Sequence, residues 1–205
     1  MVQGQSSISC VSRTPKAINR KGSDMKKNIG SKQVLYPTPL VVVGAMSGDE
    51  PTWTLVAHIG IPTHSNIMVS LAKPHFINQF VKKNEAFSIN IVDESWLKEA
   101  DYCGSASGAK TSKADVFAWT AGDAGAPIID SAKVSMELKV EDIYEMGVFE
   151  NFMCSVLNTY AEESVLYEKG AVDYTVFKPV LFEMPGYAYL ATGDKIADCL
   201  KLQAG

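Results

Sequence analysis

The chain has 205 residues, enough for one globular domain with or without an appendage. Hydrophobic residues make up 46% of it and charged residues 20%, a balance typical of globular proteins with a sizeable core. The formal net charge of −4 argues against a nucleic-acid partner. No apolar run approaches the roughly 20 residues of a membrane-spanning helix, so we expect no membrane association.

Cysteines and histidines are too scattered to predict a disulfide framework or a metal site. The four cysteines form no CxxC pair, which favours reduced thiols in a reducing compartment, and we expect a cytoplasmic protein. These cysteines are Cys10, Cys103, Cys154 and Cys199. The three histidines lack the HExxH spacing of a zinc site, so we predict no bound metal.

Residues 1–24 differ in composition from the rest of the chain. They are rich in Ser, Lys and Arg and contain no acidic residue before Asp24. They lack the apolar centre of a secretory signal, which leaves two interpretations. One is a targeting peptide; the other, which we favour, is an upstream extension before a start at Met25. We expect residues 1–24 to be a disordered extension and residues 25–205 to form the folded domain.

Apolar runs bounded by turn residues predict seven strands. They lie at residues 34–45, 52–61, 66–71, 87–91, 134–141, 148–160 and 177–182. The first two are expected to form a hairpin across a turn of about five residues. Residues 134–141 alternate apolar and charged side chains, which predicts a strand with one face in the core and one in water.

Short helices are predicted between these strands. Pro74 favours a helix start, and an apolar stripe continues from it to Asn84. Asp93 is a suitable N-cap for a second helix through Ala100, and residues 115–119 predict a helical turn. Mostly antiparallel strands with two or three inserted helices predict an all-β barrel rather than a doubly wound sheet.

Lys73 and His75 flank Pro74 at the predicted start of the first helix. Free N–H groups and the helix dipole favour an anion at such a position, and Lys73 adds a positive charge. The alternative is a surface lysine beside a partly buried histidine. The spacing alone favours that alternative.

Other candidate positions are individually weak. The loop at residues 104–110, GSASGAK, could approach a phosphate or ribityl chain closely, although alone it is better explained as a flexible solvent loop. A second candidate lies on the strand at residues 52–61 and consists of Trp53, Thr54 and His58. These side chains could form a wall of a ring-binding pocket. The alternative is that they belong to a sheet surface or a dimer contact. Cys103 is either a reactive or an inert thiol, and the inert interpretation is favoured. No arrangement indicates hydrolysis, so we predict no catalytic side chain.

Three central segments together resemble the flavin reductase-like, FMN-binding split-barrel family, and most closely its flavoredoxin-type branch. The segments are SLAKPHF, KKNEAFSINIVDE and KEADYCGSASG. The resemblance extends from about residue 34 to the C-terminus. It implies a mainly β, six-stranded antiparallel Greek-key split barrel with two or three short helices, spanning residues 25–205. It also implies a homodimer with FMN near the subunit interface.

The resemblance assigns cofactor-binding positions on a strand, a phosphate segment and a lid-like loop. The strand maps to Thr54, Leu55, Val56, Ala57 and His58; the phosphate segment to Ser70, Leu71, Lys73, His75 and Phe76; and the loop to Cys103, Gly104, Ser107 and Gly108. Members of the family pass electrons between NAD(P)H, FMN and an acceptor. The flavin carries out the hydride chemistry, so no acid or base of the protein is required.

The chain departs from the family pattern at Leu55, His58, Ala72 and Ile77. The family usually has Thr, an aromatic residue, a basic residue and Ser or Thr at these positions, respectively. Three hypotheses follow. The first is an NAD(P)H:FMN oxidoreductase. The second is a non-catalytic flavoredoxin-type electron carrier that needs a redox protein partner. The third is a degenerate split barrel that binds a ligand without redox turnover.

Overall fold

The computed structural model describes residues 26–202, so the disordered extension predicted at residues 1–24 lies outside the described residues. The chain divides into two compact units, Met1–Val34 and Leu35–Gly205. All the described helices and strands belong to the second unit. No helix within residues 26–202 is long and apolar enough to cross a membrane.

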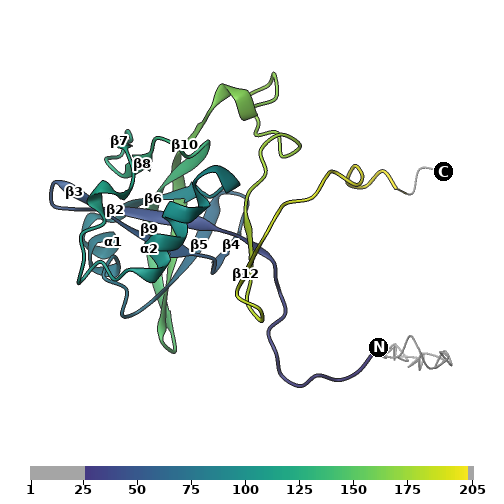
Figure 1. Ribbon diagram of the computed structural model, residues 1–205, viewed down its shortest axis with the longest axis horizontal. Coiled ribbons are helices and arrows are strands. Elements are labelled where there is room, and N and C mark those ends of the chain that lie inside the picture. Colours follow the sequence, from purple (N-terminus) through teal and green to yellow (C-terminus); the bar gives the residue numbers. More distant parts are fainter. Residues whose placement is uncertain (1–25, 203–205) are drawn as a thin grey trace, which may run out of the picture. The chain divides into compact units, whose positions relative to one another are not determined.

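The main element is a curled sheet of seven strands in the order β3-β2-β6-β9-β10-β5-β4, with every neighbouring pair antiparallel (Figure 1). Its strands are β2 (Val41–Ser47), β3 (Glu50–Val56), β4 (Ile59–Gly60), β5 (Asn66–Ala72), β6 (Ala86–Ile91), β9 (Val134–Met146) and β10 (Phe149–Ala161). The resemblance implied six strands, and the structure has seven because the predicted strand at residues 52–61 is divided into β3 and β4.

Two smaller sheets accompany the main one. Strands β1 (Thr38–Pro39), β11 (Leu181–Glu183) and β12 (Ala188–Leu190) form a three-stranded sheet in the order β1-β11-β12. Strands β7 (Trp119–Ala121) and β8 (Pro127–Ile129) form a hairpin. The predictions missed the β7–β8 hairpin, because its strands have only three residues each and the Gly/Ala-rich segment between them reads as a loop. They also missed β12, which is equally short.

The helices are short. They are α1 (Asn78–Asn84), α2 (Leu97–Ser105) and the 3-10 turns η1 (Glu94–Trp96), η2 (Ala114–Val116) and η3 (Glu163–Val165). The prediction that α1 starts near Pro74 is wrong. The N–H of His75 is bonded to the carbonyl of Ala72, and the regular helix begins four residues after Pro74. The free N–H groups expected around His75 therefore do not form a helix N-terminus.

The core lies on both faces of the sheet, and β2 explains why. Val41, Val43 and Ala45 face one cluster, which also contains residues of α1, β6 and β10. Val42 faces the other cluster, where α2 and η2 cover β2 and β3. The continuous apolar run in β2 is thus buried on both sides, as expected for a central strand.

Candidate functional site

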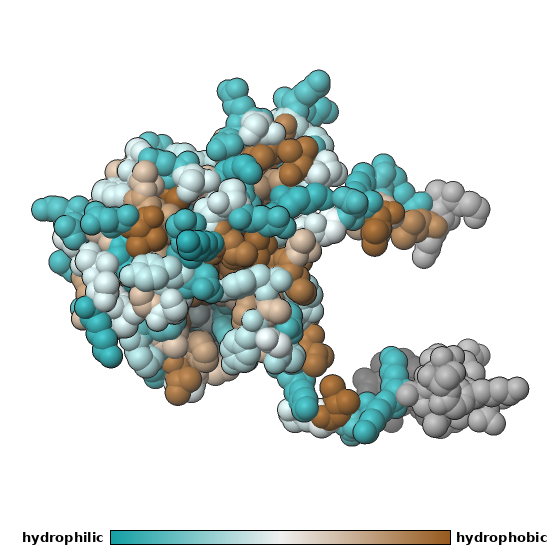
Figure 2. Space-filling model, in the orientation of Figure 1, coloured by the Kyte–Doolittle hydropathy of each residue, from teal (hydrophilic) through white to brown (hydrophobic). Residues whose placement is uncertain are grey.

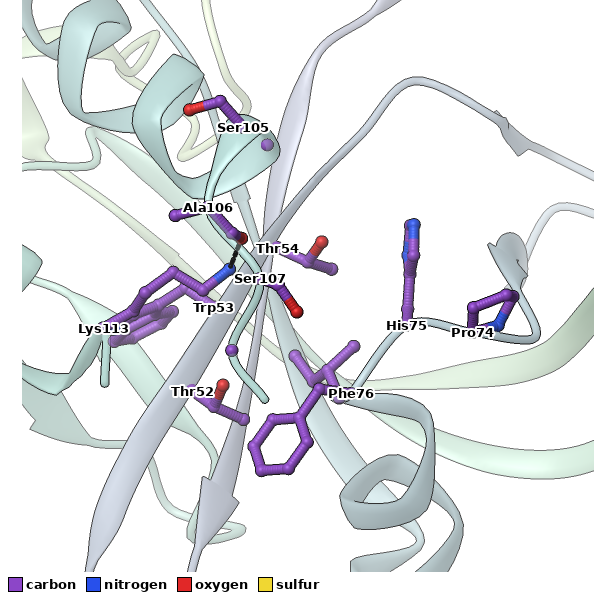
Figure 3. A pocket seen from close by; sticks show the side chains of 13 residues that line it. Thr52, Trp53, Thr54, Pro74, His75, Phe76, Ser105, Ala106, Ser107 and Lys113 are labelled. Atoms are coloured by element: carbon purple, nitrogen blue, oxygen red, sulfur yellow. Dashed lines mark hydrogen bonds between the residues drawn. The ribbon is translucent and has the colours of Figure 1, made fainter. Parts of the chain in front are cut away.

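A first cavity, of about 170 Å³, lies where three segments distant in sequence meet. Its walls come from β3, from the turn after β5, and from the loop after α2 together with Lys113. Figure 3 shows Lys113 on one side of the loop, and His75 and Phe76 on the other. The lining consists of Thr52, Trp53, Thr54, Pro74, His75, Phe76, Ile77, Gly104, Ser105, Ala106, Ser107, Gly108 and Lys113.

Strand β3 supplies two buried threonines to this cavity. Thr52 and Thr54 lie two residues apart, so their side chains emerge on the same face of the strand. They are 5% and 8% exposed, and neither hydroxyl has a hydrogen-bond partner among the described residues. The indole N–H of Trp53, between them, is also a buried donor without an acceptor in residues 26–202.

Lys113 is the buried cation of the first cavity. It is 4% exposed, and its Nζ donates to the carbonyls of Cys103 at 2.9 Å and Ala106 at 3.0 Å. An ammonium group has three N–H donors, and within residues 26–202 only two of them have an acceptor. Burial lowers the pKa of Lys113. No carboxylate lines the first cavity, so the charge of Lys113 is not neutralised there.

His75 places a second basic group at the first cavity. Its side chain is exposed at the cavity mouth, yet the surrounding protein removes enough water to lower the imidazole pKa, and the nearby charge of Lys113 lowers it further. The charge of Lys113 without a carboxylate gives the first cavity a positive potential, and His75 can add to it when an anion favours its protonated form. Such a cavity attracts an anion, because the anion restores the solvation that both groups lack.

The loop after α2 passes close to the other walls. A Cβ at Gly108 would lie 2.9 Å from Cδ1 of Phe76 and 3.3 Å from Oγ1 of Thr52. A Cβ at Gly104 would lie 3.0 Å from Cβ of Leu55. Glycine therefore lets the loop backbone lie directly against the ring of Phe76 at Gly108, and lets the last turn of α2 lie directly against β3 at Gly104.

A second cavity, of about 550 Å³, adjoins the first, because Gly104 and Ser105 line both. One side is formed by the end of β3 and the residues after it. The other side is largely aromatic and comes from β10 and the β11–β12 hairpin. The aromatic side chains are Phe149, Phe182, Tyr187 and Tyr189, and the β3 side is Leu55, Val56, Ala57 and His58.

Neighbouring side chains hold the second cavity in shape. The Nε2 of His58 is hydrogen-bonded to the Tyr36 hydroxyl at 3.1 Å, and the imidazole packs edge-on against Phe149 with ring centroids 5.5 Å apart. The hydroxyl of Tyr189 donates to the carboxylate of Asp101 on α2. Burial, followed by the hydrogen bond and negative charge of Asp101, raises the pKa of Tyr189 to about 12. This tyrosine therefore stays protonated at neutral pH.

The structure brings most of the predicted site residues to one of the two cavities. The first cavity contains Thr54, His75, Phe76, Gly104, Ser107 and Gly108. The second contains Leu55, Val56, Ala57, His58 and, again, Gly104. These positions come from three separate stretches of sequence, so their convergence follows from the sheet order rather than from local spacing.

Four predicted residues line neither cavity. Ser70 donates to Asn151 on β10, and Leu71 is fully buried in the core. Lys73 forms an ion pair with Glu145, with Nζ and Oε2 2.5 Å apart. Cys103 is buried, and this burial raises its thiol pKa to about 11, which agrees with the inert interpretation.

The sequence predictions missed Thr52, Lys113 and the aromatic side of the second cavity. Thr52 was detectable, because it alternates with Thr54 along one strand. Nothing in the local sequence distinguishes Lys113 from the other lysines, since its burial depends on the path of the loop over it. Phe149, Phe182 and Tyr187 reach the site only through the folded arrangement of β10 and the β11–β12 hairpin.

A protein-family model described as "Flavin reductase like domain" matches residues 33–182 of the chain. The chain belongs to the flavin reductase-like family. The match covers the whole first cavity, and the second cavity except for Met184, Tyr187 and Tyr189 on the β11–β12 hairpin. Within residues 26–202, no group of three or more His, Cys, Asp or Glu side chains is placed to hold a metal ion.

Two solved flavoredoxins are similar over nearly their whole length. The flavoredoxin of Methanosarcina acetivorans is 26% identical, with 87% of this chain and 97% of that one covered and a TM-score of 0.81. The flavoredoxin of Desulfovibrio vulgaris (Miyazaki F) is 29% identical, with 87% and 99% covered and a TM-score of 0.79. An FMN-binding protein from Thermus thermophilus shares the fold, at 20% identity, 85% and 100% coverage and a TM-score of 0.74.

A curated relative from Aeropyrum pernix, described as an uncharacterized protein, is 23% identical over 171 residues. The alignment covers 77% of this chain and 63% of the relative, so the chain spans less than two thirds of the length of that protein.

Proposed function

We propose that the chain is an FMN-binding flavin reductase-like oxidoreductase, which passes electrons between NAD(P)H, flavin and an acceptor. The observation that carries the proposal is the buried ammonium of Lys113, which lacks a carboxylate partner in a cavity that opens into a larger aromatic one. A cationic cavity suits a phosphate group, and an aromatic cavity suits a planar ring. FMN has both parts in one molecule.

The donor set of the first cavity fits a phosphate monoester. Lys113 offers positive charge, His75 offers an imidazole N–H, Thr52 and Thr54 offer unused hydroxyls, and Ser107 adds another hydroxyl from the loop. A phosphate has three strong acceptor oxygens, and charged or buried donors bind such groups best. In this proposal Lys73 contributes less, because Glu145 already neutralises it.

The second cavity would hold the isoalloxazine ring against the end of β3. Val56 and Ala57 line that end of the cavity, and Phe149 and Tyr187 offer aromatic surface. The bound flavin supplies hydride and single-electron transfer, and the chain orients the ring and limits its contact with water. The departure from the family pattern at Ile77 weighs less than the sequence suggests, because Thr52 and Thr54 supply hydroxyls to the same cavity that Ile77 lines.

An absorbance spectrum with and without added FMN tests this proposal. We expect flavin bands that stay with the protein through gel filtration, and oxidation of NADH or NADPH when an electron acceptor is present. A colourless protein that does not retain added FMN would contradict flavin binding, and would favour the degenerate, ligand-binding split barrel.

A second candidate function is that of a non-catalytic electron carrier. The similarity to two flavoredoxins over 97% and 99% of their lengths favours it. In that case the chain would bind FMN but oxidise NAD(P)H only slowly unless a partner reductase is added. Fast turnover with FMN and NAD(P)H alone would exclude the carrier, and FMN reduction that depends on an added reductase would exclude the enzyme.

We also propose that the chain is a cytoplasmic homodimer with one flavin reductase-like domain over residues 25–205. Exposed apolar side chains at the tip of the β9–β10 hairpin support the dimer. Tyr144, Met146 and Val148 are 60%, 64% and 68% exposed. The backbone of Val148 is bonded to that of Lys73 at the end of β5, so this apolar tip lies beside the turn that enters the first cavity.

Apolar surface also gathers away from this hairpin. Figure 2 shows hydrophobic side chains at the surface of the view in the region where Figure 1 labels β4 and β12. Near β4, Ile61 is 80% exposed at the rim of an apolar cavity of about 390 Å³. Contiguous apolar surface of this kind is typical of a protein that buries it against a partner.

A further inference from the structure

A third cavity, of about 390 Å³, lies across the main sheet from the second cavity. Side chains alternate between the two sides of extended backbone, so Leu40 lines the second cavity whereas Pro39 and Val41 line the third. His58 and Ile59 divide between the two cavities in the same way. The backbone of these segments separates the cavities, and a ligand in one leaves the other free.

The floor and sides of the third cavity are aliphatic. Strands β2 and β6 form the floor, where Val41 and Ile89 are each 1% exposed and Ile91 is 8% exposed. Ile67 on β5 and Met136 on β9 form the sides and are half-buried. These side chains belong to the core cluster that packs against α1, so the cavity is a hollow in the core rather than a flat patch.

The chemistry of this lining disfavours a charged ligand. No residue that lines the third cavity carries a charge. The only polar side-chain group in the lining is the hydroxyl of Tyr174 at the rim, which makes no hydrogen bond within residues 26–202. An ion placed here would lose its hydration without gaining a partner, whereas an apolar molecule would gain by leaving water.

The size of the third cavity suits a small molecule. Ligand pockets are mostly apolar, with a few polar groups and volumes of roughly 300–1,000 Å³. A second copy of the chain could cover Ile61 at the exposed rim, but Val41 and Ile89 line the floor while almost closed to solvent. A broad protein surface would therefore rest on the rim, and a slender molecule would reach the floor.

We propose that the third cavity is a second ligand site, which binds one uncharged aliphatic molecule carrying at most one hydroxyl group. The hydroxyl would lie at the rim beside Tyr174, and the hydrocarbon part would lie on the floor against β2 and β6. This inference goes beyond the proposed function, because it requires no flavin.

Calorimetric titration of the full chain with 1-hexanol, 1-octanol and 1-decanol tests the inference. We expect saturable binding of one molecule per chain, with affinity rising about fourfold for each added methylene. Octanoate and octylammonium are matched to 1-octanol in length and should bind far more weakly, because each carries a charge. Uptake without saturation, or equal affinity for the alcohol and the two ions, would overturn the inference.

Two variants locate the ligand. Ile67→Phe enlarges a side of the cavity and should weaken 1-octanol binding at least about tenfold, because the added ring takes up the space of several methylenes. Leu157→Phe is the matched control, since Leu157 is an exposed aliphatic residue of β10 that does not line the cavity. Ile61→Asp, at a rim position 80% exposed, leaves the core untouched and should also weaken binding. Unchanged 1-octanol affinity in Ile61→Asp and in folded Ile67→Phe would contradict the site.

Competition experiments separate this site from the flavin site and from a protein partner. Saturating FMN should leave 1-octanol affinity unchanged, and competition would place the alcohol in the second cavity and overturn the inference. Loss of 1-octanol binding in step with dimer formation, as the protein concentration rises, would show that a second copy fills the cavity and would also overturn it. FMN affinity is measured on the same samples, so failure of this inference is distinguishable from failure of the proposed function.

Discussion

At the scale of the residue, the proposed site depends on Lys113, a lysine that the structure buries without a carboxylate. We predict that Lys113→Met weakens FMN binding at least about tenfold, because a charge-assisted contact to a phosphate is lost. Riboflavin, which lacks the phosphate, should bind unchanged. Stability should fall modestly, because the carbonyls of Cys103 and Ala106 lose their donor, although methionine fills a similar volume and removes the cost of burying a charge.

Fluorescence titrations with FMN and riboflavin check this prediction, and Lys98→Met serves as a control for the loss of a lysine elsewhere. Equal weakening of FMN and riboflavin binding would show that Lys113 supports the loop and does not contact the phosphate.

His75 is expected to make FMN affinity depend on pH, and the direction of that dependence follows from the imidazole pKa. Its pKa is lowered in the free protein by partial burial and by Lys113, so the imidazole is mostly neutral at pH 7. A bound phosphate would favour the protonated form, and by linkage FMN affinity should rise as the pH falls from 8 towards about 6.5. In the absence of FMN, the stability of the folded protein depends on pH in the opposite direction. A lowered histidine pKa favours the folded state above the unfolded value of 6.5, and this contribution is lost as the pH falls below that value.

FMN titrations across this pH range, with His75→Gln for comparison, check the coupling. The variant should bind FMN with a flatter pH dependence, while the protonation of the phosphate itself affects both proteins equally. An unchanged slope in His75→Gln would show that the imidazole does not sense the ligand.

At the scale of the element, a buried glutamate fixes the β7–β8 hairpin to the sheet. Glu137 on β9 is fully buried and accepts hydrogen bonds from the backbone N–H groups of Ala124 and Ala126, and from the side chains of Asn158 and Tyr160. Burial alone would raise its pKa, but these hydrogen bonds outweigh burial and lower it. Its contribution to stability is therefore present above the unfolded value of 4.5 and is lost as the pH falls through the lower folded pKa.

We predict that Glu137→Gln lowers the free energy of unfolding by about 1–3 kcal/mol, because an amide N–H₂ would face donors that need an acceptor. Denaturant unfolding measures this loss, and FMN affinity should stay unchanged because Glu137 lines none of the three cavities. Glu141→Gln on the same strand is the control, since Glu141 is exposed and its replacement should change stability much less than that of Glu137. Equal losses in the two variants would contradict the role of the buried network.

The same hairpin shows how far the sequence predicts this fold. The strand predicted at residues 148–160 lies within one residue of β10 at each end, because burial of its apolar side chains determines it locally. The strand predicted at residues 34–45 was placed correctly at its apolar end but begins only at Val41, because the short strand β1 pairs with β11 instead. The β7–β8 strands are held by Glu137 and by Asn90, which accepts the N–H of Ile129. Such contacts join residues far apart in the chain, so no local pattern reports them.

The candidate site divides in the same way. Thr54, His75 and Gly108 were identified because the sequence segments around them resemble those of a known family. The burial of Lys113 and the position of Tyr187 in the second cavity depend instead on the tertiary path of two loops. Pro74 illustrates the limit. Its ring suits a helix start, but the N–H of His75 is bonded within a turn, and the helix begins only at Asn78.

At the scale of the whole molecule, the proposed homodimer predicts a link between assembly and ligand binding. The apolar tip of the β9–β10 hairpin carries Met146, which is exposed, and the tip is joined to the first cavity through the Val148–Lys73 backbone bond. Met146→Glu would place a charge on this apolar surface without touching the core. We expect the variant to fold with unchanged stability, to sediment as a monomer, and to bind FMN more weakly than the unsubstituted protein.

Analytical ultracentrifugation with and without FMN measures the assembly, and Ile196→Glu, at a fully exposed apolar side chain, controls for the added negative charge. A dimer that resists Met146→Glu would place the interface elsewhere on the surface. A monomeric variant that retains full FMN affinity would show that one subunit completes the site by itself. Loss of dimer and loss of FMN affinity together would show that the flavin site is completed by the second subunit, and that neither property can be changed in isolation.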